Sequence, residues 1–388
     1  MTITDRAGSV GVESDPRRWA GLAVLAGSLL MVVMDMTILN VALPSMASDL
    51  RPTSTELLWI VDVYALVVAG LLVTTSSLGD RWGRRMMLVA GFLVFGIASA
   101  AILFADSPGE VIAVRVLLGV GGAMIMPSTL SLIRHLFPDP RERATALGVW
   151  GAMAAVGAAL GPIVGGALLE AFSWHSAFLV NIPVMAAAIV AALLLLPESR
   201  SSRPPRLDVP GAVASIAGMA ALMYSIKEFG KHGFGLTPVV ILLCAAIVLG
   251  WFVWRCLRRE DPLLEVRLFG GRTFTAGTVT ALVTSVGLAA MLLLGAQWLQ
   301  LVQGYSPLRA GIALLPAAVF GLAGSLLAPP IAERIGSAGS AGKPLADAAR
   351  SAFTDSFTAF GVAGALLLAV SAAAVWMLTP RDARGGGH

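Results

Sequence analysis

Three ionisable side chains lie inside stretches that are otherwise apolar and long enough to form membrane-spanning helices. Asp35 occurs in SLLMVVMDMTILNVALP, Asp62 in WIVDVYALVVAG and Arg115 in RVLLGVGGAMIMPS. At about 1.5 Å per helical residue, each lies roughly 8 to 13 Å from the outer end of its span. A charge at this depth costs several kcal/mol unless it faces a partner or a wet cavity.

Two carboxylates and one guanidinium at similar depth could exchange a proton for a cation. Burial raises the pKa of a carboxyl group and a nearby guanidinium lowers it, so both together allow titration near neutral pH. An ionised carboxylate attracts a cation and a neutral one releases it. We therefore expect proton coupling and cation binding at Asp35, Asp62 and Arg115. In the alternative, structural interpretation, Arg115 pairs with one aspartate and fixes helix packing.

Six further residues could line a cavity for a planar cation, because aromatic rings attract cations and polar side chains orient them. They are Trp59, Tyr64, Glu228, Gln297, Trp298 and Gln300. The two glutamines could equally serve helix packing. Lys227 is expected to extend its ammonium group to the membrane interface, where Glu228 could simply be solvated.

Membrane helices must position these residues, because the chain is too apolar for a soluble domain. Of its 388 residues 57% are hydrophobic and 13% are charged, and the mean hydropathy is +0.83. Soluble domains carry about 25% charged residues. The apolar runs are too long and too little alternating for barrel strands, so the expected fold class is an all-α polytopic membrane protein. The first run carries Asp35 and precedes many others, so it is not a cleaved signal peptide.

About eleven spans are expected from the length of the apolar runs. They cover residues 19–43, 55–78, 86–105, 110–133, 143–169, 175–197, 209–229, 236–254, 274–302, 307–331 and 356–378. Arginines gather in every second connection, which by the positive-inside rule places the N-terminus in the cytoplasm. The expected location is the inner (plasma) membrane.

Polar stretches divide the chain into eight predicted segments. These are a cytoplasmic N-terminal segment (1–18), a six-helix bundle (19–197), a cytoplasmic linker (198–208), two additional helices (209–254), a cytoplasmic loop (255–273), the start of a second bundle (274–336), a junction SAGSAGK (337–343) and a final helix with its tail (344–388). The junction has the composition of a flexible linker.

Two local motifs add to this pattern. The loop after the second span, GDRWGRR, combines glycines for a tight turn with charges that can cap a helix or pair with one another. Its residues of interest are Gly79, Asp80, Arg81, Gly83, Arg84 and Arg85. The fifth span has small residues that permit close helix contact and a proline that interrupts its hydrogen bonds. These are Gly157, Gly161, Pro162, Gly165 and Gly166.

Taken in order, these stretches resemble the major facilitator superfamily and, within it, the fourteen-helix drug:proton antiporters. The resemblance covers residues 19–336 nearly continuously and rests on MDMTILNVALP, WIVDVYALVVAG, GDRWGRR, RVLLGVGGAMIMPS, LGPIVGGALLE and SWHSAFLVNIP. It implies two pseudo-symmetric six-helix bundles plus two extra helices, working by alternating access.

The resemblance also implies roles for the residues named above. Asp35 and Asp62 match carboxylates implicated in proton coupling and cation recognition, and Arg115 matches an arginine linked to proton coupling. The loop 79–85 matches a conformational latch between the bundles, and the glycines and proline of the fifth span match the antiporter motif.

The function implied is proton-coupled efflux of lipophilic cations. The implied cargo is quaternary ammonium antiseptics and dyes such as ethidium, with fluoroquinolones as a further class. The expected partners are these drugs, protons and the lipid bilayer, with a monomeric chain, no cofactor and no nucleic acid.

The chain departs from the fourteen-helix pattern in its second bundle. IAERIG at 331–336 repeats LGDRWG at 78–83, so the ninth and tenth spans correspond to the first two of a second bundle, and three following helices are missing. An engineered or natural deletion, an incomplete sequence and an altered topology all explain this, and SAGSAGK favours an edited chain. The alternative function is therefore a truncated membrane protein that binds such ligands without exporting them.

Other function classes are disfavoured. The four histidines, His135, His175, His232 and His388, have no metal-ligand spacing, and the sequence shows no nucleophile motif or phosphate-binding loop. Cys244 and Cys256 suggest neither a disulfide framework nor a metal site. The net charge of +4 comes from loop arginines and is first an orientation signal. The sequence therefore predicts a secondary active transporter rather than an enzyme.

Overall fold

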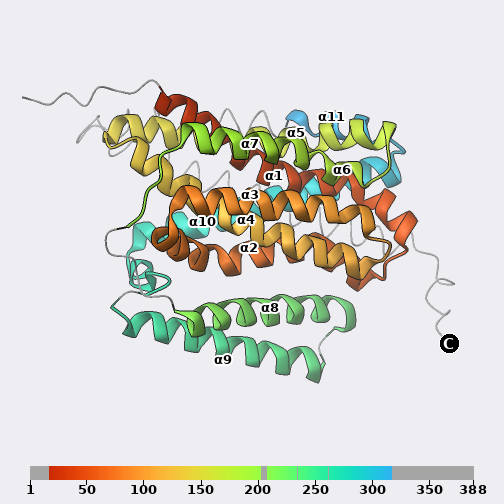
Figure 1. Cartoon of the computed structure of the whole chain (residues 1–388). Coiled ribbons are helices and arrows are strands. Elements are labelled where there is room, and N and C mark those ends of the chain that lie inside the picture. Colours follow the sequence, from red (N-terminus) through yellow and green to blue (C-terminus); the bar gives the residue numbers. More distant parts are fainter. Residues whose placement is uncertain (1–16, 202–207, 234, 261, 317–388) are drawn as a thin grey trace, which may run out of the picture.

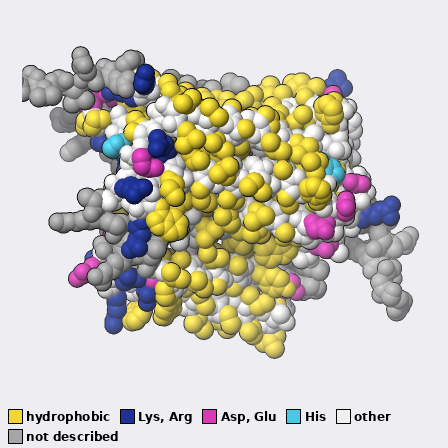
Figure 2. All heavy atoms as spheres, in the orientation of Figure 1, with side chains coloured by type: hydrophobic (Ala, Val, Ile, Leu, Met, Phe, Trp, Pro, Cys, Tyr) yellow, Lys and Arg dark blue, Asp and Glu magenta, His cyan; other side chains and the backbone are white. Residues whose placement is uncertain are grey.

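Helices account for the regular structure of the described residues, which are 17–201, 208–233, 235–260 and 262–316 of the computed structural model. No β-strand occurs among them. Eight of their helical segments are long and apolar enough to cross a membrane. Figure 2 shows an apolar band between two ends that carry most of the charged side chains. The prediction of an all-α, multi-pass membrane protein is confirmed.

The first six spans form one bundle. Its helices are α1 (Arg17–Leu50), α2 (Ser54–Trp82), α3 (Arg84–Ala101) with a 3₁₀ turn (Ile102–Phe104), α4 (Pro108–Leu136), α5 (Pro140–Ala171), and the short α6 (Ser176–Leu179) followed by α7 (Asn181–Leu195). Helix α1 packs mainly on α5, α2 packs on α4, and α3 packs between α4 and α7 (Figure 1).

Local sequence signals fix where these helices begin. Thr53 and Ser107 each accept a hydrogen bond from a backbone amide three residues on, and the glutamate at that position caps in return. Asp139 caps α5 in a similar way, and a proline follows it at the first helical position. Such caps satisfy amide groups that have no partner inside the helix.

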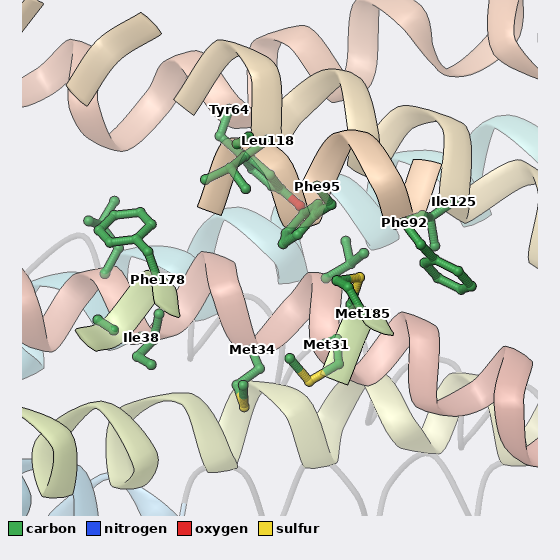
Figure 3. Close-up of a cluster of buried hydrophobic side chains, with 14 of the residues drawn as sticks. Met31, Met34, Ile38, Tyr64, Phe92, Phe95, Leu118, Ile125, Phe178 and Met185 are labelled. Carbon is green, nitrogen blue, oxygen red and sulfur yellow. The ribbon is translucent and has the colours of Figure 1, made fainter. Parts of the chain in front are cut away.

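The bundle interior is filled by methionine, leucine, isoleucine and aromatic side chains from all of its helices. Figure 3 labels some of them: Met31, Met34, Ile38, Tyr64, Phe92, Phe95, Leu118, Ile125, Phe178 and Met185. Lipid tails are as apolar as these side chains, so close packing rather than escape from water holds the helices together. This rigid packing positions the polar groups described below.

A helical hairpin, α8 (Val209–His232) and α9 (Leu236–Arg258), lies beside this bundle and packs on α2 through α8 (Figure 1). Asp208 caps α8 at the Gly211 amide and forms ion pairs of 2.8 Å with both Arg255 and Arg259 at the end of α9. These contacts join the two helices at the end of the hairpin opposite its connecting turn.

Two further helices follow the hairpin. A 3₁₀ turn (Val266–Gly270) leads into α10 (Arg272–Gln297), which ends in a π-helical turn (Trp298–Val302), and α11 (Pro307–Ala313) follows. Helix α10 packs on α1 and α11 packs on α5. The rest of the predicted tenth span, the SAGSAGK junction and the span expected at 356–378 lie outside the described residues, so the number of eleven stays a prediction.

Two features of the helices differ clearly from those expected. The first span was expected to end before Pro44, but α1 continues through this proline to Leu50. Proline has a helical φ, and membrane helices tolerate it where neighbours satisfy the freed carbonyl group. The sixth span is interrupted at Val180, between α6 and α7.

Candidate functional site

A buried ion pair joins the first and fourth helices of the bundle. The Nη1 atom of Arg115 on α4 lies 2.9 Å from Oδ2 of Asp35 on α1. Each residue is only 1% exposed. The sequence placed these two groups at similar depth, and the fold brings them into direct contact.

Two more helices complete the surroundings of Asp35. The Asn181 side-chain amide, at the start of α7, donates a hydrogen bond of 2.8 Å to Oδ1 of Asp35. The same amide nitrogen lies 3.2 Å from the hydroxyl of Ser99 on α3. Asp35 is thus the centre of a polar junction between α1, α3, α4 and α7.

The Arg115 guanidinium also contacts α2. Its Nε donates to the backbone carbonyl of Ile60 at 3.2 Å, and its central carbon lies 4.5 Å from the centroid of the Tyr64 ring. Tyr64 is fully buried, and within the described residues its hydroxyl has no hydrogen-bond partner. The Asp35 carboxylate and the face of the Tyr64 ring together stabilise the guanidinium of Arg115 in this buried position.

Asp62 does not join this junction, contrary to the expected grouping of three charges. Its Oδ2 lies 2.9 Å from Nζ of Lys227 on α8, and its side chain is 34% exposed. Asp62 follows Ile60 by two positions, which on a helix with 3.6 residues per turn places the two on opposite sides. Lys227 was expected to extend its ammonium group to the membrane interface; in the structure its side chain is 12% exposed and its Nζ pairs with Asp62.

The aromatic candidates divide between the two carboxylates. Tyr64 lies on the Asp35 side, whereas the Trp59 ring lies 4.3 Å from Nζ of Lys227 and stacks on Tyr224 of α8. A pocket of about 360 Å³ opens beside this stack, between α2 and α8. Its lining comprises Ser54, Thr55, Leu58, Trp59, Tyr224, Lys227, Glu228 and Gly230.

The remaining cavity candidates lie where α10 turns into the π-helical segment. Gln297 is the last residue of α10, and Trp298 is 52% exposed. The side-chain nitrogen of Gln300 is buried without a hydrogen-bond partner among the described residues. A cavity role for these three stays a prediction.

The loop of residues 79–85 is bound by the chain segment that leaves α7. Asp80 forms an ion pair of 2.8 Å with Arg84, and the Arg84 amide donates to the carbonyl of Ser199. The Glu198 carboxylate accepts hydrogen bonds from the amides of Arg85 and Met86, at the start of α3. Its negative charge there is favourable because a helix N-terminus is electropositive.

Two other loop residues complete this contact. Arg85 also donates from Nη1 to the Leu196 carbonyl at 3.0 Å. Gly83 has φ of +123°, a conformation that side chains rarely adopt, and a Cβ atom there would lie 2.6 Å from Oε1 of Glu198. Arg81 lies in the last turn of α2.

The glycines of α5 form the face that packs on α1 and α11. A Cβ atom at Gly157 would lie 2.5 Å from the Leu30 carbonyl oxygen, and one at Gly165 would lie 2.6 Å from the Ile38 side chain. One at Gly161 would overlap the Thr37 hydroxyl, and one at Gly166 would overlap the backbone of α11. From the other side, Gly311 of α11 approaches the carbonyl of Pro162 so closely that a Cβ atom there would overlap it.

Sequence reasoning missed three polar contacts at these sites. Asn181 and Ser99 lie in apolar runs, and the argument that singled out Asp35 also applies to them. Lys227 was expected to extend to the membrane interface, and its partner could not be inferred because α2 and α8 are distant in the sequence. Glu198 carried no signal, since a glutamate after the last apolar residue of a span is ordinary.

A bundle of membrane helices with a buried ion pair in its interior defines a polytopic membrane protein, and ionisable residues at such depth mark a functional site. Residues 25–383 match the sequence profile of the Major Facilitator Superfamily, and the chain belongs to this family. The family expected from the motifs is confirmed, and it is a family of transporters rather than enzymes.

The similar proteins described next are named as a drug-efflux pump and a resistance protein. The chain is 42% identical over 318 residues to the multidrug efflux pump LfrA of Mycolicibacterium smegmatis, an alignment that covers 82% of this chain and 63% of LfrA. It is 38% identical over 321 residues to the methyl viologen resistance protein SmvA of Salmonella typhimurium, covering 82% of this chain and 65% of SmvA. The chain therefore spans slightly less than two thirds of the length of these relatives.

Solved structures show the same fold at low sequence identity. A bacterial homologue of the human lysosomal transporter Spinster, in an inward-facing and unoccupied conformation, has a TM-score of 0.52 and 20% identity, covering 83% of this chain and 64% of that one. A POT family transporter in complex with 5-aminolevulinic acid has a TM-score of 0.59 and 15% identity, covering 81% of this chain and 70% of that one.

Proposed function

We propose that this chain acts as a proton-coupled multidrug antiporter that exports lipophilic cations by alternating access. The cargo class is quaternary ammonium antiseptics and dyes such as ethidium, with fluoroquinolones as a further class. The single observation that carries the proposal is the buried Asp35 carboxylate, held by Arg115 and Asn181 where four helices meet. One relative is named for resistance to methyl viologen, which is a flat organic dication.

Proton coupling follows from the charge balance of this junction. When Asp35 is ionised, Arg115 neutralises it and the ion pair joins α1 to α4. When Asp35 takes up a proton, Arg115 loses its counter-charge, and its other contacts among the described residues are the Ile60 carbonyl and the Tyr64 ring. The attraction between the two helices therefore depends on the proton, which gives the proton a means to favour one conformation.

We assign the helix movement of this conformational change to the glycine face of α5. Gly157, Gly161 and Gly165 bring α5 onto α1, the helix of Asp35, and Gly166 brings it onto α11, beyond the first bundle. Closely packed small residues let helices slide or separate without side chains that must rearrange. In this proposal the face seals the pathway in one conformation, and the loop 79–85 holds the cytoplasmic side closed.

The same proposal includes an orientation in the membrane. Most Lys and Arg side chains visible in Figure 2 lie at the end where α1 begins, and by the positive-inside rule that end faces the cytoplasm. The N-terminus is then cytoplasmic, the membrane is the inner (plasma) membrane, and the chain works as a monomer.

Drug-dependent proton movement tests the proposal. Everted membrane vesicles that contain the chain are energised, and a pH-sensitive dye reports their acidic interior. Adding a lipophilic cation should release protons from the parent chain, and Asp35→Asn should abolish this release. Asp106→Asn is the matched control, because Asp106 is exposed. An unchanged release in Asp35→Asn would contradict the role of Asp35.

A second candidate function is a membrane protein that binds such cations without exporting them. The observation in its favour is that the chain spans only 63% of the length of LfrA. Cation binding to the purified chain together with no proton release in the vesicle experiment would favour this second candidate.

A further inference from the structure

An ammonium group from outside the first bundle is held at Asp62. Lys227 belongs to α8, in the hairpin that packs beside the bundle, and its Nζ lies 2.9 Å from Oδ2 of Asp62. The Nζ atom is buried, the side chain is only 12% exposed, and among the described residues Nζ has this ion pair but no hydrogen bond of good geometry. Lysine normally keeps its ammonium group in water, so its burial here requires the carboxylate.

The same ammonium group lies against an aromatic face. Its Nζ is 4.3 Å from the centroid of the Trp59 ring, and Trp59 stacks on Tyr224 with ring centroids 6.5 Å apart. A carboxylate and a tryptophan face are the two groups that bind organic cations most effectively, through charge and through the electron-rich ring. Lys227 is therefore bound as such a cation would be bound.

A pocket beside the ammonium offers room for a larger cation. Its volume of about 360 Å³ lies within the usual range for small-molecule sites. Trp59, Tyr224 and Lys227 contribute to its lining, whereas Asp62 does not. Glu228, the neighbour of Lys227, supplies a carboxylate to the same wall.

We propose that Lys227 is a tethered competitor that occupies a cation site formed by Asp62 and Trp59, and that a flat lipophilic cation binds in this pocket by displacing the ammonium group. The class of ligand rests on the proposed function, but the competition does not. It predicts that the affinity for such cations is lowered by Lys227, because the site is free only while the ammonium group is displaced.

Equilibrium binding to the purified full chain tests the competition. Ethidium fluorescence is titrated for the parent chain, for Lys227→Gln and for Asp62→Asn. The expected result is a roughly tenfold lower apparent Kd in Lys227→Gln, as for a site freed from a competing occupant, and a higher Kd in Asp62→Asn. An unchanged or higher Kd in Lys227→Gln would overturn the proposal.

Two further variants locate the effect and control for it. Adding Trp59→Leu to Lys227→Gln should remove the gain in affinity, and a gain that persists would place ethidium elsewhere and overturn the proposal. Arg258→Gln is the matched control, because Arg258 lies 4.6 Å from the Trp254 ring on the same hairpin, away from this pocket. It should bind as the parent does.

A second Lys227 variant and a comparison with efflux distinguish a change in binding from a defect in folding or in transport. If Lys227→Gln does not purify as a folded protein, Lys227→Met gives the same test with an apolar chain of similar length. Binding needs no proton gradient, so a gain in affinity without efflux would support the competition and reject the pump. Efflux by the parent chain together with an unchanged Kd in every Lys227 variant would support the pump and reject the competition.

Discussion

The carboxylate of Asp35 and the guanidinium of Arg115 lie 2.9 Å apart between α1 and α4, and neither residue is more than 1% exposed. Two opposite charges at such a depth compensate each other, whereas either one alone would be a buried, unpaired charge. The pair therefore stabilises the contact between α1 and α4, and one proton on Asp35 removes its charge balance.

Removing Arg115 alone should be much more harmful than removing both charges. We expect Arg115→Met to lower the free energy of unfolding by roughly 3–5 kcal/mol, because Asp35 is left buried without its counter-charge. The double variant Asp35→Asn with Arg115→Met should recover much of this loss. A double-mutant cycle of unfolding in detergent micelles measures the coupling, and strictly additive losses would show that the pair contributes nothing as a pair.

The glycine face of α5 should tolerate no added methyl group where it meets α1. In Gly161→Ala the new Cβ atom would overlap the Thr37 hydroxyl, so we expect a loss of roughly 1–3 kcal/mol. Gly151→Ala is the matched control on the same helix, because nothing lies within 4 Å of a Cβ atom there. It should be neutral or stabilising by up to about 1 kcal/mol. Equal effects in the two variants would refute the close contact.

The fold could be predicted from the sequence because length and hydropathy alone determine membrane helices. The motif order then identified the family that residues 25–383 match. Helix ends were less accessible, as Pro44 shows, because α1 continues through it to Leu50 and a local rule cannot include the tertiary contacts that permit this.

The candidate site could be predicted only in part. Asp35 and Arg115 were found because a charge in an apolar run needs a partner, and the fold joins them. Depth along a helix says nothing about the direction in which a side chain points, so Asp62 was grouped with them although it faces Lys227. That ion pair depends on how α8 docks on α2, which no local pattern encodes.

Glu198 should stabilise the loop after α2 by capping α3. We expect Glu198→Ala to lower the unfolding temperature, with a loss of about 1 kcal/mol. Glu198→Gln should have a smaller effect, because its one amide oxygen can still accept one of the two backbone hydrogen bonds, which go to different oxygens of the carboxylate. Trypsin cleavage at Arg81, Arg84 and Arg85 should become faster. The exposed Glu170→Ala serves as the control, and cleavage at the parent rate in Glu198→Ala would show that the cap is not needed.

The α8–α9 hairpin should loosen in acid. Burial raises the pKa of Asp208, but hydrogen bonds from Arg255, from the Gly211 amide and from Arg259 outweigh it, so this pKa lies below its ordinary value of 3.8. A carboxylate with a lowered pKa stabilises the fold fully above the pKa that it has in the unfolded chain, and it loses this effect as the pH falls through the folded value.

Asp208→Asn provides the measurement of this pH dependence. Its unfolding temperature in detergent should lie below that of the parent chain at pH 6, and the difference should shrink as the pH falls below about 4. The exposed Asp106→Asn should follow the parent chain throughout. A difference that is constant from pH 6 to pH 3 would exclude ionisation of Asp208 as its source.

Ethidium efflux from energised cells tests most directly whether the buried carboxylate of Asp35 drives export. Cells that contain equal amounts of the parent chain, Asp35→Asn or Asp106→Asn in the membrane are loaded with ethidium, and its loss is followed by fluorescence. We predict that the parent chain and Asp106→Asn export the dye until the proton gradient is collapsed, and that Asp35→Asn retains it as cells without the protein do. Export by Asp35→Asn at the rate of the parent chain, or no export by a folded parent chain, would contradict this account.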